Sequence, residues 1–151
     1  MKYLLKGDGI CRRQIPICKM KPNEEMIIKL TELARSAHEN SYSPYSRFRV
    51  GAALLAKSGR IYIGANFENS SFGAGSCAER VALGSALAAG EREFEAICVY
   101  ADRTVTPCGI CRQALSEFGD MAVICAGDDG GRREYMLSEL LPAAFSDEAL
   151  H

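Results

Sequence analysis

Tryptophan is absent from this 151-residue chain, histidine occurs only twice and proline only five times. No apolar run approaches the ~20 residues that a membrane-spanning helix requires, and the first residues lack the apolar stretch of a secretory signal. The formal net charge of −1 argues against a protein that binds nucleic acid mainly through its phosphates. Because 48% of the residues are hydrophobic, intrinsic disorder is excluded as well. We therefore expect a single soluble domain with no membrane partner.

Cysteine, in contrast, is abundant, with seven copies. An odd number leaves at least one thiol unpaired, and a chain of this length buries enough surface to fold without disulfides. We therefore expect a reducing, cytoplasmic setting, in which clustered cysteines bind a metal or take part in catalysis.

The first 22 residues differ from the rest in charge. They contain six Lys or Arg residues and one acid, Asp8, so they carry +5 and leave −6 for the remainder. We interpret residues 1–22 as a basic, solvated and partly mobile N-terminal extension, and residues 23–151 as the folded domain.

Hydrophobic periodicity predicts alternating helices and strands in that domain. Asn23 is a good N-cap for a helix whose apolar face recurs from Met26 to Ala37. After it we expect strands over 48–56 and 60–67, a helix over 77–89, a strand over 94–101, a helix over 109–117, strands over 121–126 and 132–136, and a short helix over 137–141.

The lengths of the connections predict the topology of the sheet. The tight turn at residues 57–59 makes the first two strands an antiparallel hairpin. Helices between later strands imply parallel neighbours covered by those helices. The link over 127–131 is too short for a parallel crossover, so the last two strands should be antiparallel. The fold class is therefore α/β, with a five-stranded mixed sheet whose first and last strand pairs are antiparallel.

Three cysteines and one glutamate carry the strongest chemical signal. Cys77 and Glu79 open one predicted helix, and Cys108 and Cys111 open another. Both helices follow strands, so their N-termini can meet at one edge of the sheet, where the helix dipole favours thiolates. Three thiolates fill three corners of tetrahedral zinc and leave the fourth for water, as in a catalytic site. Glu79 is close enough to carry protons between that water and a substrate.

Two arginines directly follow residues of this cluster. Three thiolates and Zn²⁺ sum to a charge of −1, which weakens the metal as a Lewis acid. We expect Arg80 and Arg112 to donate hydrogen bonds to the ligand sulfurs and so draw off part of that charge.

Two other interpretations of the cysteines are open. A closed structural zinc site would use Cys98 or Cys125 as the fourth ligand, but both lie within apolar strands, where a lone cysteine usually acts as a small buried hydrophobe. A redox dithiol formed by the C-x-x-C pair would leave Cys77 and Glu79 without a role.

Six segments, in the same order, resemble the small zinc-dependent cytidine deaminases that act on free nucleosides, and the resemblance covers residues 26–148. The segments are YSPYSRF (42–48), VGAA (50–53), GANFEN (64–69), CAER (77–80), PCGICRQ (107–113) and LLPAAF (140–145). The resemblance implies a three-layer α/β/α cytidine-deaminase-like fold, with residues 23–151 as the catalytic domain, one zinc ion per subunit, and a homotetramer with its sites at subunit interfaces.

The resemblance also implies a reaction of pyrimidine salvage. Glu79 would protonate ring nitrogen N3 while zinc-bound hydroxide attacks C4, so that cytidine and deoxycytidine yield uridine and deoxyuridine plus ammonia. The residues with implied roles are Cys77, Cys108 and Cys111 as zinc ligands, Asn66 and Glu68 on the ribose, Phe48 on the pyrimidine face, Phe145 from a neighbouring subunit, and Ala78 and Phe72 as further substrate contacts.

Departures from the family pattern keep other functions open. The family commonly has Tyr where this chain has Phe72. From the small residues over 73–76 we expect a roomier pocket near the ribose or the base. A deaminase of a modified cytidine, or of a cytosine antibiotic such as blasticidin, is therefore the main alternative. A tRNA-editing deaminase fits less well, since that class typically uses His as first ligand and has a parallel final strand pair. A non-catalytic zinc module would not explain Glu79.

Overall fold

The structure is a computed structural model that describes residues 21–146 and 150. All but the last two residues of the predicted basic extension therefore lie outside the described residues. The strands are β1 (Val50–Ala56), β2 (Ile61–Ala65), β3 (Phe94–Ala101), β4 (Ala122–Gly127) and β5 (Arg132–Met136). The α-helices are α1 (Glu24–Glu39), α2 (Ala78–Ala88), α3 (Gly109–Ser116) and α4 (Leu137–Leu140), and a 3₁₀ turn spans Phe72–Ala74.

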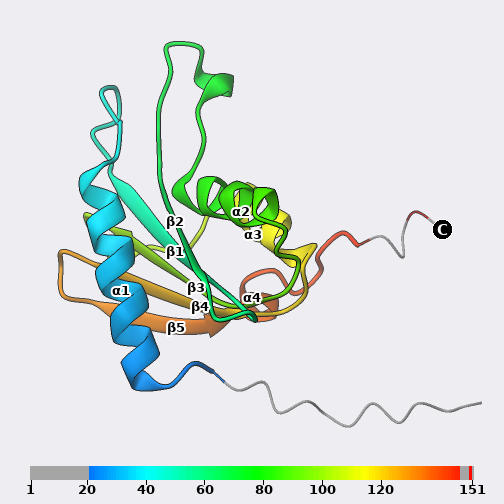
Figure 1. Ribbon diagram of the computed structural model, residues 1–151. Helices are drawn as coiled ribbons and strands as arrows, with labels where there is room; N and C mark the ends of the chain where they lie inside the picture. The colour runs from blue at the N-terminus through cyan, green and yellow to red at the C-terminus, as the bar shows by residue number, and fades with distance from the viewer. Residues whose placement is uncertain (1–20, 147–149, 151) are drawn as a thin grey trace, which may run out of the picture.

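The five strands form one mixed sheet in the order β2-β1-β3-β4-β5 (Figure 1). β1 is antiparallel to both β2 and β3, β3 and β4 are parallel, and β4 and β5 are antiparallel. The antiparallel first and last pairs confirm the topology predicted from the connection lengths. Helix α2 carries the chain from β2 past β1 to β3, so β2 and β3 run in the same direction on either side of β1.

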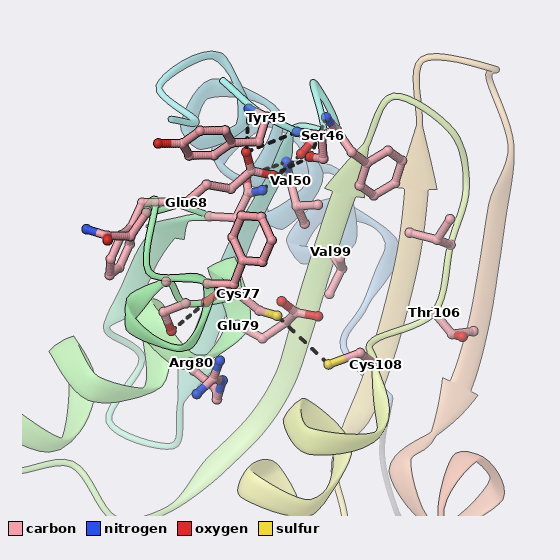
Figure 2. Close-up of a pocket in the computed structure, with 18 residues that line it drawn as sticks. Tyr45, Ser46, Val50, Glu68, Cys77, Glu79, Arg80, Val99, Thr106 and Cys108 are labelled. Atoms are coloured by element: carbon pink, nitrogen blue, oxygen red, sulfur yellow. Dashed lines mark hydrogen bonds between the residues drawn. The ribbon is translucent and has the colours of Figure 1, made fainter. Parts of the chain in front are cut away.

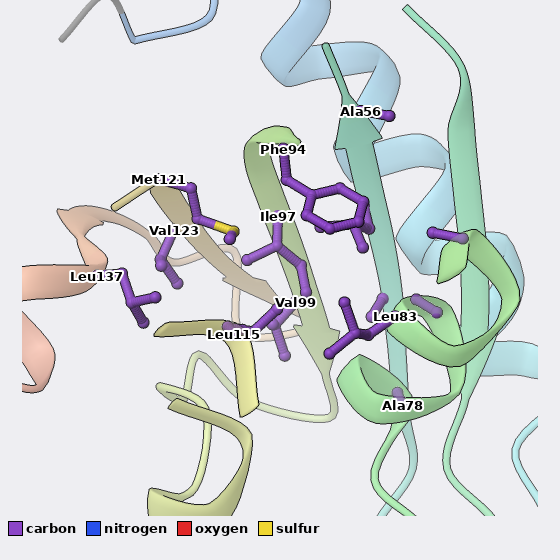
Figure 3. Packing of buried hydrophobic residues seen from close by; sticks show 14 of the residues in the cluster. Ala56, Ala78, Leu83, Phe94, Ile97, Val99, Leu115, Met121, Val123 and Leu137 are labelled. Atoms are coloured by element: carbon purple, nitrogen blue, oxygen red, sulfur yellow. The ribbon is translucent and has the colours of Figure 1, made fainter. Parts of the chain in front are cut away.

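Helices cover both faces of the sheet, which gives three layers. Alternate residues of the central strands enter two separate cores, one beneath α1 and one beneath α2 and α3. In the second core, Phe94, Ile97 and Val99 of β3 pack with Leu83 and Leu115 from the two helices (Figure 3). None of the helices in the described part of the chain has the length and hydropathy needed to span a bilayer.

Helix α1 begins as the sequence predicts. The side chain of Asn23 accepts a hydrogen bond from the Met26 amide at 2.9 Å, and Glu24 and Glu25 lie in the positive first turn. The helix buries an apolar stripe that includes Leu30 and packs on β1 and β3.

Two glycines allow the helices to approach the sheet closely. A Cβ at Gly51 would lie 2.0 Å from the carbonyl oxygen of Ala34 in α1, and one at Gly64 would lie 2.3 Å from the carbonyl oxygen of Ala78 in α2. Only glycine fits at such contacts. Gly64 therefore sets the position of the first turn of α2, next to Cys77 and Glu79.

Candidate active site

Three cysteine sulfurs converge where α2 and α3 begin. Cys77 is the N-cap of α2 and Cys108 is the N-cap of α3, while Cys111 lies in the first turn of α3. The three Sγ atoms lie within 4.8 Å of one another. Those of Cys77 and Cys108, which face each other in Figure 2, are 3.8 Å apart. The two helix N-termini thus meet, as the positions of the strands predict.

The groups around the three sulfurs favour the thiolate form of Cys77. The pKa of Cys77 falls to about 5, chiefly because the Cys111 thiol donates a hydrogen bond to it; burial opposes this, while Cys108 and the Arg80 guanidinium add to it. The pKa of Cys111 is raised, because it supplies that hydrogen bond and is itself buried. The Nε of Arg80 is buried and has no hydrogen-bond partner among the described residues.

This set of donors fits a zinc ion. Zinc binds thiolate sulfur, and a site with three protein ligands leaves a position for water, unlike a closed four-ligand site. Within the described residues, neither Cys98 nor Cys125 belongs to the sulfur cluster. Both are buried within strands, where burial raises the pKa of Cys98 to about 12 and that of Cys125 to about 11.

Glu79 lies beside the sulfurs on the floor of a cavity. Its carboxyl group is near Cys77 and Cys108 (Figure 2), and the residue is only 4% exposed. Burial raises the pKa of Glu79, and the negative charge of Cys77 raises it further. A carboxyl group in this position can hold a proton at a higher pH than an exposed glutamate can.

The cavity has a volume of about 720 Å³ and extends from the sulfurs toward the loop between α1 and β1. Four of the predicted substrate contacts line it: Phe48, Asn66, Glu68 and Phe72. The 3₁₀ turn around Phe72, which the sequence did not predict, leaves that side chain 83% exposed at the cavity.

Two predicted substrate contacts do not line the cavity. Ala78 is fully buried and belongs to the core beneath α2 and α3. Phe145 lies 60% exposed beside α3, where Gln113 donates a hydrogen bond to its carbonyl oxygen at 2.8 Å. Within a single chain, neither side chain reaches the site.

Asn66 holds the segment that forms one wall of the cavity. Its Nδ2 donates to the carbonyl oxygen of Phe48 at 2.9 Å, and its Oδ1 accepts from the amide of Val50 at 2.8 Å and from the hydroxyl of Ser41. The side chain therefore pairs with residues 48 and 50 as a neighbouring strand would.

Glu68 holds the preceding turn in the same way. Its Oε2 accepts from the amides of Tyr45 at 2.8 Å and Ser46 at 3.1 Å, and its Oε1 accepts from the Ser46 hydroxyl. The same hydroxyl oxygen accepts from the Phe48 amide at 3.0 Å. The sequence gives Ser46 no predicted role. Its place in the Pro-containing turn of YSPYSRF is nevertheless a signal, because such a turn requires hydrogen bonds from side chains to hold its conformation.

The two arginines differ in what they contact. Arg80 lies against the thiols of Cys77 and Cys111, as predicted. Arg112 instead donates to the carbonyl oxygens of Pro107 at 2.7 Å and Leu140 at 3.0 Å, and to the Thr106 hydroxyl at 2.8 Å. The expected donation from Arg112 to a ligand sulfur is therefore wrong for this structure, because oxygen acceptors on the neighbouring loop and α4 satisfy its guanidinium.

A family model described as the cytidine and deoxycytidylate deaminase zinc-binding region matches residues 24–127. The chain belongs to this family. The matched range includes the three clustered cysteines and Glu79, and the description of the family names zinc as the metal that its members bind. The match ends with β4, so β5, α4 and the segment that contains Phe145 lie outside it.

Individual relatives cover nearly the whole folded part of the chain. A cytidine deaminase from Halalkalibacterium halodurans is 47% identical over 133 residues, which are 85% of this chain and 98% of the relative. The crystal structure of a cytidine deaminase from Burkholderia pseudomallei superposes with a TM-score of 0.75 at 44% identity, covering 78% of this chain and 98% of the other. A blasticidin-S deaminase from Bacillus cereus is more distant, at 28% identity over 129 residues, 79% of this chain and 91% of that protein.

Proposed function

We propose that this protein is a zinc-dependent hydrolase that deaminates cytidine and deoxycytidine to uridine and deoxyuridine. The observation that carries the proposal is the buried Glu79 beside three converging sulfurs, on the floor of a cavity large enough for a nucleoside. The similarity to cytidine deaminases, which exceeds that to the blasticidin-S deaminase, supports the same substrate class.

Cys77, Cys108 and Cys111 would hold the zinc ion. Bound there, zinc supplies Lewis acidity and keeps one coordination position for water. Arg80 faces the same sulfurs and offsets part of their negative charge.

Glu79 moves the protons of the hydrolysis. In the overall reaction water adds oxygen to C4 of the cytosine ring, the bond from C4 to the exocyclic nitrogen breaks, and ammonia leaves. Glu79 takes a proton from the water and gives it to ring nitrogen N3. It then takes the proton of the hydroxyl group formed at C4 and delivers it to the departing amine, which leaves the C4 carbonyl of the product. The raised pKa of Glu79 suits a group that must both accept and return a proton near neutral pH.

Asn66 and Glu68 retain the capacity to bind one sugar hydroxyl. The contacts to the wall use both acceptor positions of Asn66 Oδ1 and one of its two amide hydrogens, and they leave one acceptor position on Glu68 Oε1. A hydroxyl group can accept from the remaining N–H and donate to the remaining oxygen. We assign this pair to the ribose 3′-hydroxyl, and Phe48 to the face of the pyrimidine.

We also propose a homotetramer in which Phe145 serves the site of a neighbouring subunit. Phe145 is exposed and held at its backbone by Gln113, and Tyr45, Phe67 and Phe72 expose further aromatic surface at the cavity. Large exposed apolar surface marks a site of association. Light scattering of the purified protein gives the oligomer number, and the exposed aromatic residues predict more than one subunit.

The free thiols fit a reducing compartment, so we place the protein in the cytoplasm.

The decisive experiment follows the loss of ultraviolet absorbance when the zinc-loaded protein meets cytidine and, in parallel, deoxycytidine. Glu79→Gln should lower kcat at least about 10³-fold, since general acid–base catalysis is lost, while the zinc content stays at one per chain. Glu117→Gln, an exposed glutamate at the end of α3, is the matched control and should keep full activity. Near-normal turnover by Glu79→Gln would overturn the proposal, and so would inactivity of the wild type towards both nucleosides.

A further inference from the structure

A carboxylate outside the cavity joins the two segments that form its walls. Asp102 directly follows β3, and its Oδ2 accepts a hydrogen bond from the backbone amide of Arg49 at 3.1 Å. Its Oδ1 accepts from the Arg49 side chain, at 3.2 Å from Nε and 3.1 Å from Nη2. Since Val50 pairs with Ala101 at the end of the sheet, the carboxylate continues the pairing of β1 with β3 beyond the last strand residue.

A buried histidine holds this carboxylate from the other side. His38, in the last turn of α1, is 3% exposed, and its Nε2 lies 2.9 Å from Asp102 Oδ1. The imidazole also packs edge-on against the Tyr100 ring, with the ring centroids 5.4 Å apart. The position of Asp102 is therefore set by α1 and β3 together, and neither His38 nor Asp102 lines the cavity.

The cluster around Asp102 is a hydrogen-bonded network. Ligand atoms of His38, Asp102 and Asp128 lie within 4.8 Å of one another, which is close enough to hold a metal ion. The Arg49 guanidinium already supplies a cation there, since its Nη2 is 3.1 Å from Asp102 and 4.0 Å from Asp128. Tyr100 adds a hydrogen bond to Asp128 at 2.9 Å.

Arg49 connects this network to the cavity, because both of its neighbours, Phe48 and Val50, line it. Asn66 holds these two neighbours from one side, and Asp102 holds Arg49 from the other.

The residues after Asp102 form part of the opposite wall. Arg103 lies over the Phe48 ring, 5.8 Å from its centroid. Val105, Thr106 and Cys108 then line the cavity itself (Figure 2). Asp102 therefore lies where two parts of the cavity lining meet: residues 48–50, which it holds through Arg49, and residues 103–108, which lead to Cys108.

We propose that Asp102, held in place by His38, is a positioning residue. It fixes residues 48–50, which form the Phe48 wall of the cavity, against the bound nucleoside. This inference rests on the proposed function for its kinetic readout. Among the described residues Asp102 makes no hydrogen bond to the clustered cysteines or to Glu79, so its loss should weaken substrate binding more than it slows the chemistry.

The test compares variants of the zinc-loaded, full-length protein. Asp102→Ala should raise KM for cytidine about tenfold, the scale of one lost hydrogen bond to a charged group, with kcat changed by less than about twofold and zinc content unchanged. Asp102→Asn keeps an acceptor for the Arg49 amide, so its KM should lie close to that of the wild type. His38→Gln keeps a donor toward Asp102 and should stay nearer to the wild type than His38→Leu.

Glu91 provides the matched control. It is a largely buried carboxylate near the opposite end of β1, where its Oε1 accepts hydrogen bonds from Ser58 at 2.6 Å, Arg60 at 2.9 Å and Tyr62 at 3.2 Å. Glu91→Ala should lower the melting temperature, as Asp102→Ala does, but leave KM unchanged. Hydrogen–deuterium exchange gives a readout independent of activity: the peptide covering 44–52 should exchange about tenfold faster in Asp102→Ala and at the wild-type rate in Glu91→Ala.

A raised KM with faster exchange over 44–52, specific to Asp102→Ala, would support the inference. Unchanged KM and exchange in Asp102→Ala, or the same changes in Glu91→Ala, would overturn it and leave Asp102 with a purely structural role. Absence of turnover by the wild type would instead refute the proposed function. The exchange comparison would then decide by itself whether Asp102 fixes the wall.

Discussion

Replacing Asn66 by alanine separates two roles that the structure gives to this side chain. Asn66 holds the cavity wall through three hydrogen bonds, to Ser41, Phe48 and Val50, and retains one amide hydrogen for a ligand. Asn66→Ala removes all of these bonds, while Asn69→Ala, which removes one exposed bond to the Ser71 amide at the same cavity, is the matched control.

The loss of stability follows from the number of bonds. Each contributes about 0.5–1.5 kcal/mol net, and water can partly replace the side chain at this half-buried position, so we expect the free energy of unfolding to fall by about 2 kcal/mol. That corresponds to a melting temperature lower by roughly 4–8 °C for a chain of this size. The Asn69→Ala control should change stability by less than about 0.5 kcal/mol.

The catalytic effect is measured with two substrates. On cytidine we expect kcat/KM to fall about 100-fold, from the displaced Phe48 wall and the lost contact to the 3′-hydroxyl, at about tenfold each. On 2′,3′-dideoxycytidine, which lacks that hydroxyl, the same variant should lose only about tenfold. Equal losses on both substrates would refute the hydroxyl contact, and an unfolding free energy within about 0.5 kcal/mol of the wild type would refute the role in the wall.

Two further predictions concern the metal and the dependence of stability on pH. Cys108→Ser should abolish zinc binding and turnover, as measured by metal analysis and absorbance, whereas Cys98→Ala, at a buried cysteine outside the cluster, should keep one zinc per chain. The Ser58 hydroxyl holds the pKa of Glu91 below its ordinary value, against the effect of burial. The stability that this carboxylate adds is therefore complete above the unfolded pKa of about 4.3 and is lost as pH falls through the lower folded pKa. Melting temperatures of the wild type and Glu91→Gln should differ at pH 7 and converge in acid, and a constant difference would contradict the assignment.

The elements and their pairing could be predicted because short-range constraints determine them. Asn23 caps a helix whose apolar stripe repeats at helical spacing, and the five residues over 127–131 cannot make a parallel crossover. The convergence of the sulfurs also followed from local features, since Cys77 and Cys108 are both N-caps of helices that follow strands.

The contacts that shape the cavity could not be predicted in the same way. Asp102 meets His38 across 64 residues of sequence and Arg49 across 53, and no periodicity encodes which carboxylate an amide will reach. Arg112 was assigned to the sulfurs from its place in the motif, yet nearby oxygens are better acceptors for a guanidinium and satisfy it. The sequence motifs identify the residues of the site, but they do not specify the hydrogen-bond partners of those side chains.

The two ends of the cavity are therefore built from different kinds of interaction. The floor depends on backbone geometry, because Gly64 lets α2 approach β2 and the caps of α2 and α3 then place the sulfurs. The wall depends on hydrogen bonds to a loop without regular structure: Asn66 donates to its backbone, and the carboxylates of Glu68 and Asp102 accept from its amides. Single substitutions in the wall can accordingly change which nucleoside fits while the proton-carrying floor stays intact, and selectivity among cytosine nucleosides should vary more readily than the reaction itself.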